Sequence, residues 1–158
     1  MNQELETLNK SLPELKLMGG GERPTVRFYE GDEALYAVFN DQEQVAPKQL
    51  DEVTNLDDIH EFLDIEVLKD ARKSFNPTRT KIRILHRGAI VVRTPGVEFC
   101  ELMPALGEFH GDILIYANSV AFLTFVGKTV AVIIENQALA DTTRVLFEAA
   151  WRICSSHK

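Results

Sequence analysis

The sequence has little of what several common classes of protein require. Its 158 residues hold two cysteines, Cys100 and Cys154, too few for a disulfide-rich scaffold and too isolated for a metal site. We expect both to be buried thiols in a reducing compartment. No apolar run reaches the roughly 18 residues that a membrane helix needs, and the charged N-terminus MNQELETLNK lacks the apolar core of a signal peptide. These absences predict a cytoplasmic protein without a membrane segment.

Motifs for catalysis and nucleotide binding are equally scarce. The chain has no G-x-S-x-G nucleophile elbow and no glycine-rich phosphate loop. None of its histidines has a second ligand at metal-binding spacing: they are His60, His86, His110 and His157. We interpret them as solvated or satisfied imidazoles, with an anion contact as the alternative for His86. We expect no metal ion and no cofactor.

The composition is that of a folded globular domain. The sequence is 45% hydrophobic and 26% charged, with a formal net charge of -7. The acidic balance argues against nucleic-acid binding by the whole chain. We predict an N-terminal helix over residues 1–18, separated by Gly19–Gly21 from a single α/β domain over residues 22–158.

The N-terminal helix has a leucine seam. Its leucines recur at spacings of 3, 4 and 3, the rhythm of a coiled coil: Leu5, Leu8, Leu12 and Leu15. Two heptads interrupted by Pro13 are too short to be stable alone. The seam therefore either packs on its own domain or pairs two subunits.

The first half of the domain begins as a strand followed by a helix. PTVRFYEG alternates and predicts a strand with Val26 and Phe28 facing inward. An amphipathic helix follows Asp32. The segment QLDEVTN is interpreted as a short edge strand, and further helices are predicted from Leu56 and over residues 65–75.

The second half is rich in strands and ends in a helix. TKIRILHR and VEFCELM predict strands, and DILIYA, SVAFLTF and TVAVIIE predict an antiparallel meander of three buried strands. A helix capped by Asn136 closes the chain, and we expect full burial of Leu146, Phe147 and Trp151 on it.

Charge is unevenly distributed. Residues 51–66 hold seven acidic residues and no Lys or Arg, whereas residues 69–93 hold eight basic residues and one acidic residue. The basic stretch has three interpretations: solvated or paired charges, a dimer or partner surface, or a site for an acidic ligand. The candidate patch consists of Arg79, Lys81, Arg83 and Arg87.

Three segments resemble the effector domain of TrmB-type transcription regulators. They are RPTVRFYEGDEALYAVF, GDILIYANSVAFLTF and VAVIIENQALADTTRVLFEAAW. That domain is similar to the phospholipase D fold, so the resemblance implies an α/β sandwich with a mixed central sheet flanked by helices. It also implies a homodimer. The winged helix-turn-helix that binds DNA in these regulators does not occur in this sequence, so we expect no direct DNA contact by this chain.

Active enzymes of the phospholipase D fold contain H-x-K-x4-D, whose His is the nucleophile and whose Lys binds phosphate. The sequence has no H-x-K. Aligned on the late hairpin, Tyr116 and Asn118 take the His and Lys places and Leu123 the Asp place, and they are the candidate binding positions.

The resemblance thus implies a non-catalytic sensing and dimerisation domain that binds a small ligand or a protein partner. A phosphodiesterase-like hydrolase and a stand-alone interaction protein are the alternatives.

Overall fold

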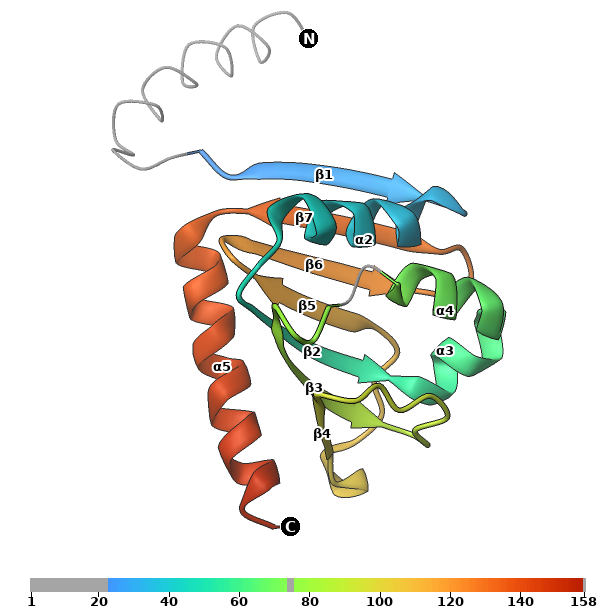
Figure 1. Ribbon diagram of the computed structural model, residues 1–158, viewed down its shortest axis with the longest axis vertical. Helices are drawn as coiled ribbons and strands as arrows, with labels where there is room; N and C mark the ends of the chain where they lie inside the picture. The colour runs from blue at the N-terminus through green and yellow to red at the C-terminus, as the bar shows by residue number, and fades with distance from the viewer. Residues whose placement is uncertain (1–22, 74–75, 158) are drawn as a thin grey trace, which may run out of the picture.

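A seven-stranded sheet lies between two layers of helices (Figure 1). The structure, a computed structural model, describes residues 23–73 and 76–157. The leucine seam and the predicted helix over residues 1–18 lie outside the described residues. Helices α2, α3 and α4 cover one face of the sheet, and α5 covers part of the other.

The sheet is mixed, as predicted. Its strand order is β1-β7-β6-β5-β2-β3-β4, with β2, β3 and β4 mutually parallel and all other neighbours antiparallel. The predicted meander is confirmed as β5, β6 and β7. The strands are β1 (Thr25–Glu30), β2 (Gln49–Asn55), β3 (Lys81–Arg87), β4 (Val97–Glu101), β5 (Asp112–Tyr116), β6 (Ser119–Thr124) and β7 (Val130–Glu135).

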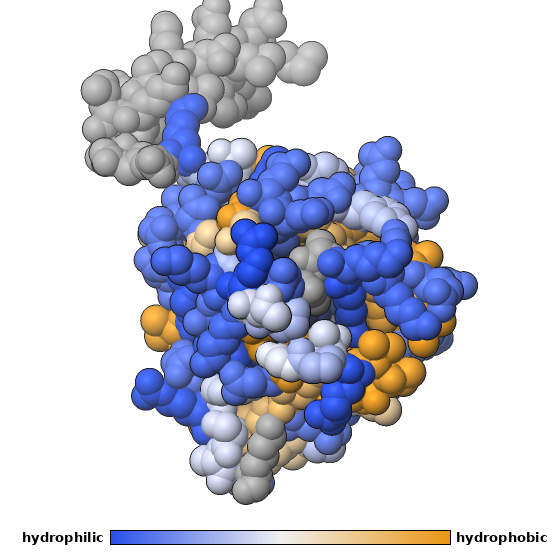
Figure 2. Space-filling model, in the orientation of Figure 1, coloured by the Kyte–Doolittle hydropathy of each residue, from blue (hydrophilic) through white to orange (hydrophobic). Residues whose placement is uncertain are grey.

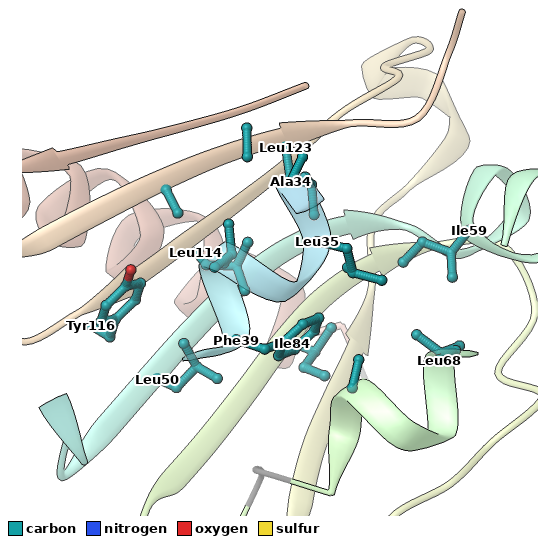
Figure 3. Packing of buried hydrophobic residues seen from close by; sticks show 14 of the residues in the cluster. Ala34, Leu35, Phe39, Leu50, Ile59, Leu68, Ile84, Leu114, Tyr116 and Leu123 are labelled. Carbon is teal, nitrogen blue, oxygen red and sulfur yellow. The ribbon is translucent and has the colours of Figure 1, made fainter. Parts of the chain in front are cut away.

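Three helices bury their apolar sides on the first face. They are α2 (Glu33–Val45), α3 (Leu56–Phe62) and α4 (Ile65–Arg72), and a short 3-10 turn, η1, follows β4 at Pro104–Leu106. Leu35 and Phe39 of α2 pack against sheet residues such as Leu114 (Figure 3), as their helical spacing predicts. None of the described helices is long and apolar enough to cross a membrane.

Strand β2 lies inside the sheet, so the prediction of an edge strand was wrong. It pairs with β3 on one side and β5 on the other. Its sequence looks like an edge because Asp51 and Glu52 interrupt the apolar pattern, yet both side chains are buried. Charged residues inside a sheet need partners there, and Asp51 has one in Arg83 of β3, 32 residues along the chain.

The inward face of β1 was also predicted wrongly. Val26 and Phe28 are 60% and 58% exposed, whereas Arg27 and Tyr29 face α2. Arg27 reaches Asp41 of α2 at 2.7 Å. The reason is that α2 covers only one face of β1, while α5 packs on β2, β4, β5 and β6.

Helix α5 (Gln137–Ser155) begins where predicted, because the Asn136 side chain accepts a hydrogen bond from the backbone of Leu139 at 3.0 Å. Fewer residues of this helix are buried than predicted. Phe147 is buried, Trp151 is half-buried and Leu146 is 67% exposed. The helix is an outer layer, and only one side of it meets the sheet.

Cys100 of β4 and Cys154 of α5 form a disulfide, with their Cα atoms 6.2 Å apart. The expectation of two free thiols was therefore wrong. The C-terminal end of α5 passes over β4 (Figure 1). A separation of 54 residues along the chain gives no indication of that contact.

Candidate functional site

The candidate site lies where the parallel strands β2 and β3 end. In open α/β sheets, ligands bind outside the carboxyl ends of such strands. Thr54 and Asn55 are the last residues of β2, and His86 and Arg87 are the last residues of β3. The segment before β5 joins them, since β5 runs antiparallel to β2. We call this region the carboxyl edge.

Asn55 connects two parts of the carboxyl edge. Its side-chain oxygen accepts hydrogen bonds from the backbone N–H groups of Asp57 and Asp58 at 3.1 and 3.3 Å, which caps α3. Its Nδ2 donates to the carbonyl of Phe109 at 2.9 Å. The first turn of α3 and the segment before β5 are thereby held side by side, and Nδ1 of His110 lies 2.9 Å from Oδ2 of Asp58.

The second imidazole of this edge is a structural one. His86 is buried, its Nδ1 lies 3.1 Å from the carbonyl oxygen of Gly88, and its ring meets Phe99 edge-on. Gly88 has a φ of +86°, and a Cβ there would lie 2.4 Å from Oδ1 of Asp57. Both the left-handed backbone and the close approach of Asp57 require glycine at this position.

Two carboxyl groups, Glu52 and Asp112, are buried beneath the edge. They line a cavity of about 20 Å³ that Arg72 also borders. Asp112 accepts hydrogen bonds from Oγ1 of Thr54 at 2.9 Å and from the backbone of Asn55 at 3.3 Å. Burial raises the pKa of Asp112 well above its usual range, and the negative charge of Glu52 raises it further. Burial also raises the pKa of Glu52, against the opposing effect of Arg72.

This pair predicts a particular pH dependence of stability. Because both folded-state pKa values are raised, the folded state binds more protons, and the free energy of unfolding falls as the pH rises from about 4 through those raised values. In Asp112→Asn, the side-chain oxygen can still accept the hydrogen bonds from Thr54 and Asn55, but the negative charge is removed. We expect it to flatten this decline and to stabilise the fold by about 1–3 kcal/mol at neutral pH. Urea unfolding at a series of pH values measures the effect.

The control for that experiment is Glu61→Gln, an exposed acid of α3. This substitution should leave unchanged both the pH dependence of the unfolding free energy and the urea midpoint. A decline equally steep in the Asp112→Asn protein would show that the buried pair does not cause it.

The chain matches several solved structures. No protein-family model and no curated protein matches it. It superposes on TrmBL2, an archaeal chromatin protein, with a TM-score of 0.56 and 17% identity over 96% of this chain and 63% of TrmBL2. It superposes on NucT from Helicobacter pylori with a TM-score of 0.58 and 9% identity, over 84% of this chain and 98% of NucT.

A third match is Nuc from Salmonella typhimurium, a phospholipase D family member. The TM-score is 0.54 and the identity 14%, over 82% of this chain and 95% of Nuc. The chain has a phospholipase D-like fold. The fold implied by the three sequence segments is thereby confirmed, and the chain spans 63% of the length of TrmBL2.

The carboxyl edge departs from the catalytic motif of the phospholipase D-like fold in its charge. Asp112 stands two residues after His110, where H-x-K requires a lysine. The His110 imidazole faces a carboxylate, Asp58, and the neighbouring Glu52 and Asp57 are acidic too. No group of three potential metal ligands occurs within residues 23–73 and 76–157.

The predicted binding positions Tyr116 and Asn118 lie at the other end of β5 from the carboxyl edge. Tyr116 is fully buried and its hydroxyl donates to Asp41 at 2.6 Å; burial raises its pKa. Asn118 lies at the β5–β6 turn, with its Nδ2 3.4 Å from Glu135. Leu123 is a core residue. The structure therefore gives Tyr116 a role in packing and in a buried hydrogen bond.

The four basic residues of the predicted patch have different surroundings. Arg83 is buried and contacts Asp51 at 2.8 Å and Glu148 at 2.8 Å. Lys81, at the start of β3, is 3.7 Å from Glu98. Arg87, at its end, donates to the carbonyl of Gly107. Arg79 precedes β3, at the edge of the sheet opposite the carboxyl edge. Three of the four predicted patch residues, Lys81, Arg83 and Arg87, thus already have partners within the chain.

Sequence reasoning missed the carboxyl edge as a unit. The spacing of His110 and Asp112 is visible in the sequence, but the interpretation of His110 as a solvated or satisfied imidazole gave it no particular partner. The contact between His110 and Asp58, and the burial of Glu52 beside Asp112, depend on β2 and β5 being neighbours. No local pattern indicates that pairing.

Proposed function

We propose that this chain is a non-catalytic sensing and dimerisation domain of a TrmB-like transcription regulator. The proposal rests chiefly on the carboxyl edge, where His110 pairs with Asp58 and is followed by the buried Asp112. The fold likeness to TrmBL2 supports it. TrmBL2 is described as a DNA-binding chromatin protein; here, DNA binding would belong to a part of the assembly outside the described residues.

A phosphodiesterase-like hydrolase is the alternative, because NucT and Nuc share the fold over most of their lengths. Its chemistry needs a nucleophile and a cationic group that holds the phosphate. Asp112 supplies a buried carboxyl in place of the lysine expected two residues after a catalytic histidine. An ionised carboxyl at this position would repel the phosphate. A protonated, neutral carboxyl would not repel it, but it would not supply the positive charge that the lysine provides. The geometry therefore favours a scaffold without phosphodiesterase activity.

The outer face of α5 is the surface that we assign to dimerisation. It exposes a large apolar residue every seven positions, a spacing of two helical turns. The stripe is formed by Leu139, Leu146 and Ile153, which are 46%, 67% and 56% exposed. Small residues, Thr142 and Ala149, lie between them and allow a second helix to approach closely. The occupant that this spacing fits is α5 of a second copy, related by a two-fold axis.

Leu146→Lys should therefore dissociate the dimer. The substitution places a charge in the middle of the stripe on both copies. We expect the free energy of dimerisation to weaken by about 2 kcal/mol or more, which is roughly a thirtyfold rise in the dimer dissociation constant. Light scattering at micromolar concentration measures it. Leu146 is already two-thirds exposed in the monomer, so the fold itself should be unaffected, which circular dichroism checks.

Phe28→Lys is the matched control, because Phe28 is similarly exposed but lies on the sheet, in β1. It should leave pairing intact. Pairing lost in Phe28→Lys and retained in Leu146→Lys would place the interface on the sheet instead. A wild-type chain that is strictly monomeric, with or without residues 1–18, would count against the dimerisation role altogether.

A sensing role requires that a ligand binds the two arrangements of the paired subunits with different affinity. A ligand that binds both equally shifts nothing.

A further inference from the structure

A pocket of about 420 Å³ lies at the edge of the sheet opposite the carboxyl edge, beside the starts of β2 and β3 and the last turn of α2. We call it the basal pocket. The lining residues that matter here are Gln42, Lys48, Lys73, Arg79 and Thr80. Its volume suits a small metabolite. The face of the molecule shown in Figure 2 is mainly hydrophilic, with a hydrophobic area along its right-hand side.

The first observation is an unsatisfied amide. Gln42 is 5% exposed, and neither its Nε2 nor its Oε1 has a hydrogen-bond partner among the residues that the structure describes. A buried amide without partners is costly, and such groups are few in folded proteins. Gln42 lines the basal pocket, and a rotation of its buried side chain would turn the amide towards a bound ligand, which would supply the missing hydrogen bonds.

The second observation is the charge of the pocket. Lys48, Lys73 and Arg79 line it against a single acid, Glu43. Lys73 also pairs with Asp70 at 2.8 Å. Within the described part of the chain, no carboxylate forms an ion pair with Lys48 or Arg79. Two unpaired cations and a third nearby are suited to a dianion, since Arg binds phosphate oxygens in pairs and Lys adds point charges.

The third observation is that hydrogen bonds hold the rim in place. Oγ1 of Thr80 donates to the carbonyl of Pro47 at 2.7 Å, and the backbone N–H of Lys81 donates to the carbonyl of Lys48 at 2.9 Å. These bonds tie the segment before β2 to the segment before β3. A site built in advance loses less entropy on binding than one that must be ordered by its ligand.

We propose that the basal pocket binds a small organic phosphate. Lys48, Lys73 and Arg79 hold the phosphate group, and a hydrogen-bonding group elsewhere on the ligand pairs with the Gln42 amide. The binding claim stands on the pocket alone; its meaning as an effector site rests on the sensing role proposed above.

Calorimetric titration of the full chain tests the binding. The probes are ribose 5-phosphate and AMP, with the uncharged ribose and adenosine as their controls. Both phosphates should bind one molecule per chain, and their uncharged partners should not. Lys48→Ala and Arg79→Ala should each weaken binding at least about tenfold. Lys81→Ala removes a neighbouring cation that pairs with Glu98 and does not line the pocket, so it should leave the affinity unchanged.

Gln42→Leu distinguishes a ligand-binding role from a structural one. Because it removes an unsatisfied buried amide, we expect a higher melting temperature without ligand together with binding at least about fivefold weaker. The proposal is overturned if neither phosphate binds at about 10 mM, a concentration at which even weak metabolite sites fill, or if the Lys48, Arg79 and Lys81 variants bind alike. Binding that leaves the monomer–dimer equilibrium unchanged would instead refute the sensing role and leave the pocket assignment intact.

Discussion

Replacing Arg83 with alanine should lower the free energy of unfolding by about 3–5 kcal/mol, because it leaves a buried carboxylate without its partner. Arg83 reaches both oxygens of Asp51, at 2.8 and 3.1 Å, and Asp51 is completely buried. The same guanidinium lies over the rings of Phe147 and Trp151, 5.1 and 5.3 Å from their centroids, and contacts Glu148. It therefore joins β2, β3 and α5. Urea unfolding followed by circular dichroism measures the loss.

Two further variants separate the cost of an orphaned charge from the value of the ion pair. Arg83→Met combined with Asp51→Leu removes both charges and should restore most of the stability. Lys81→Ala breaks only the exposed pair with Glu98, and should cost less than about 1 kcal/mol. An Arg83→Ala loss as small as that of Lys81→Ala would contradict the role assigned to Arg83.

Reduction of the Cys100–Cys154 disulfide should cost about 4 kcal/mol. The bridge closes a loop of 54 residues between β4 and the end of α5. In the chain-entropy model, a cross-link over a loop of this length removes conformational entropy from the unfolded chain and raises its free energy by about that amount. The unfolding midpoint should therefore fall when dithiothreitol is added. α5 would remain packed through Phe147, so the reduced protein should still fold.

The double substitution of Cys100 and Cys154 by alanine provides the control. This protein should unfold near the midpoint of the reduced wild type, and dithiothreitol should not affect it. Identical midpoints for the wild type with and without reductant would mean that the bridge does not form in the folded protein.

Local patterns predicted those parts of the fold that depend on neighbouring residues. The cap at Asn136, the apolar side of α2 and the β5–β7 meander follow from spacing over a few residues, and the structure contains all three. The fold family was likewise within reach, because the matching segments lie in continuous elements of the chain.

The failures all involve contacts between segments far apart in the sequence. Asp51 made β2 look like an exposed strand, because its partner Arg83 is 32 residues away. Phe28 was assigned to the core because alternation gives two faces without saying which one a helix covers. Leu146 was assigned to the core because the apolar pattern of α5 is wider than the side that the sheet can bury. In each case the packing of layers decided the outcome.

In the candidate site, too, local spacing is visible in the sequence, whereas contacts between distant segments are not. The spacing of His110 and Asp112 is local, and it already excludes an H-x-K motif. The acid that pairs with His110 and the second buried carboxyl come from α3 and β2, more than 50 residues earlier. The basal pocket also joins α2 to the segment before β3. A sequence can contain such residues without showing that they meet.

Hydrolysis of bis-nitrophenyl phosphate by the purified full chain is the measurement that decides most directly whether this phospholipase D-like scaffold is without catalysis. The wild type should release no nitrophenol above the uncatalysed rate, and His110→Ala should behave identically, because the imidazole faces Asp58 and the lysine that would hold the phosphate is replaced by Asp112. Turnover by the wild type that disappears in His110→Ala would contradict this, and the chain would then be a hydrolase.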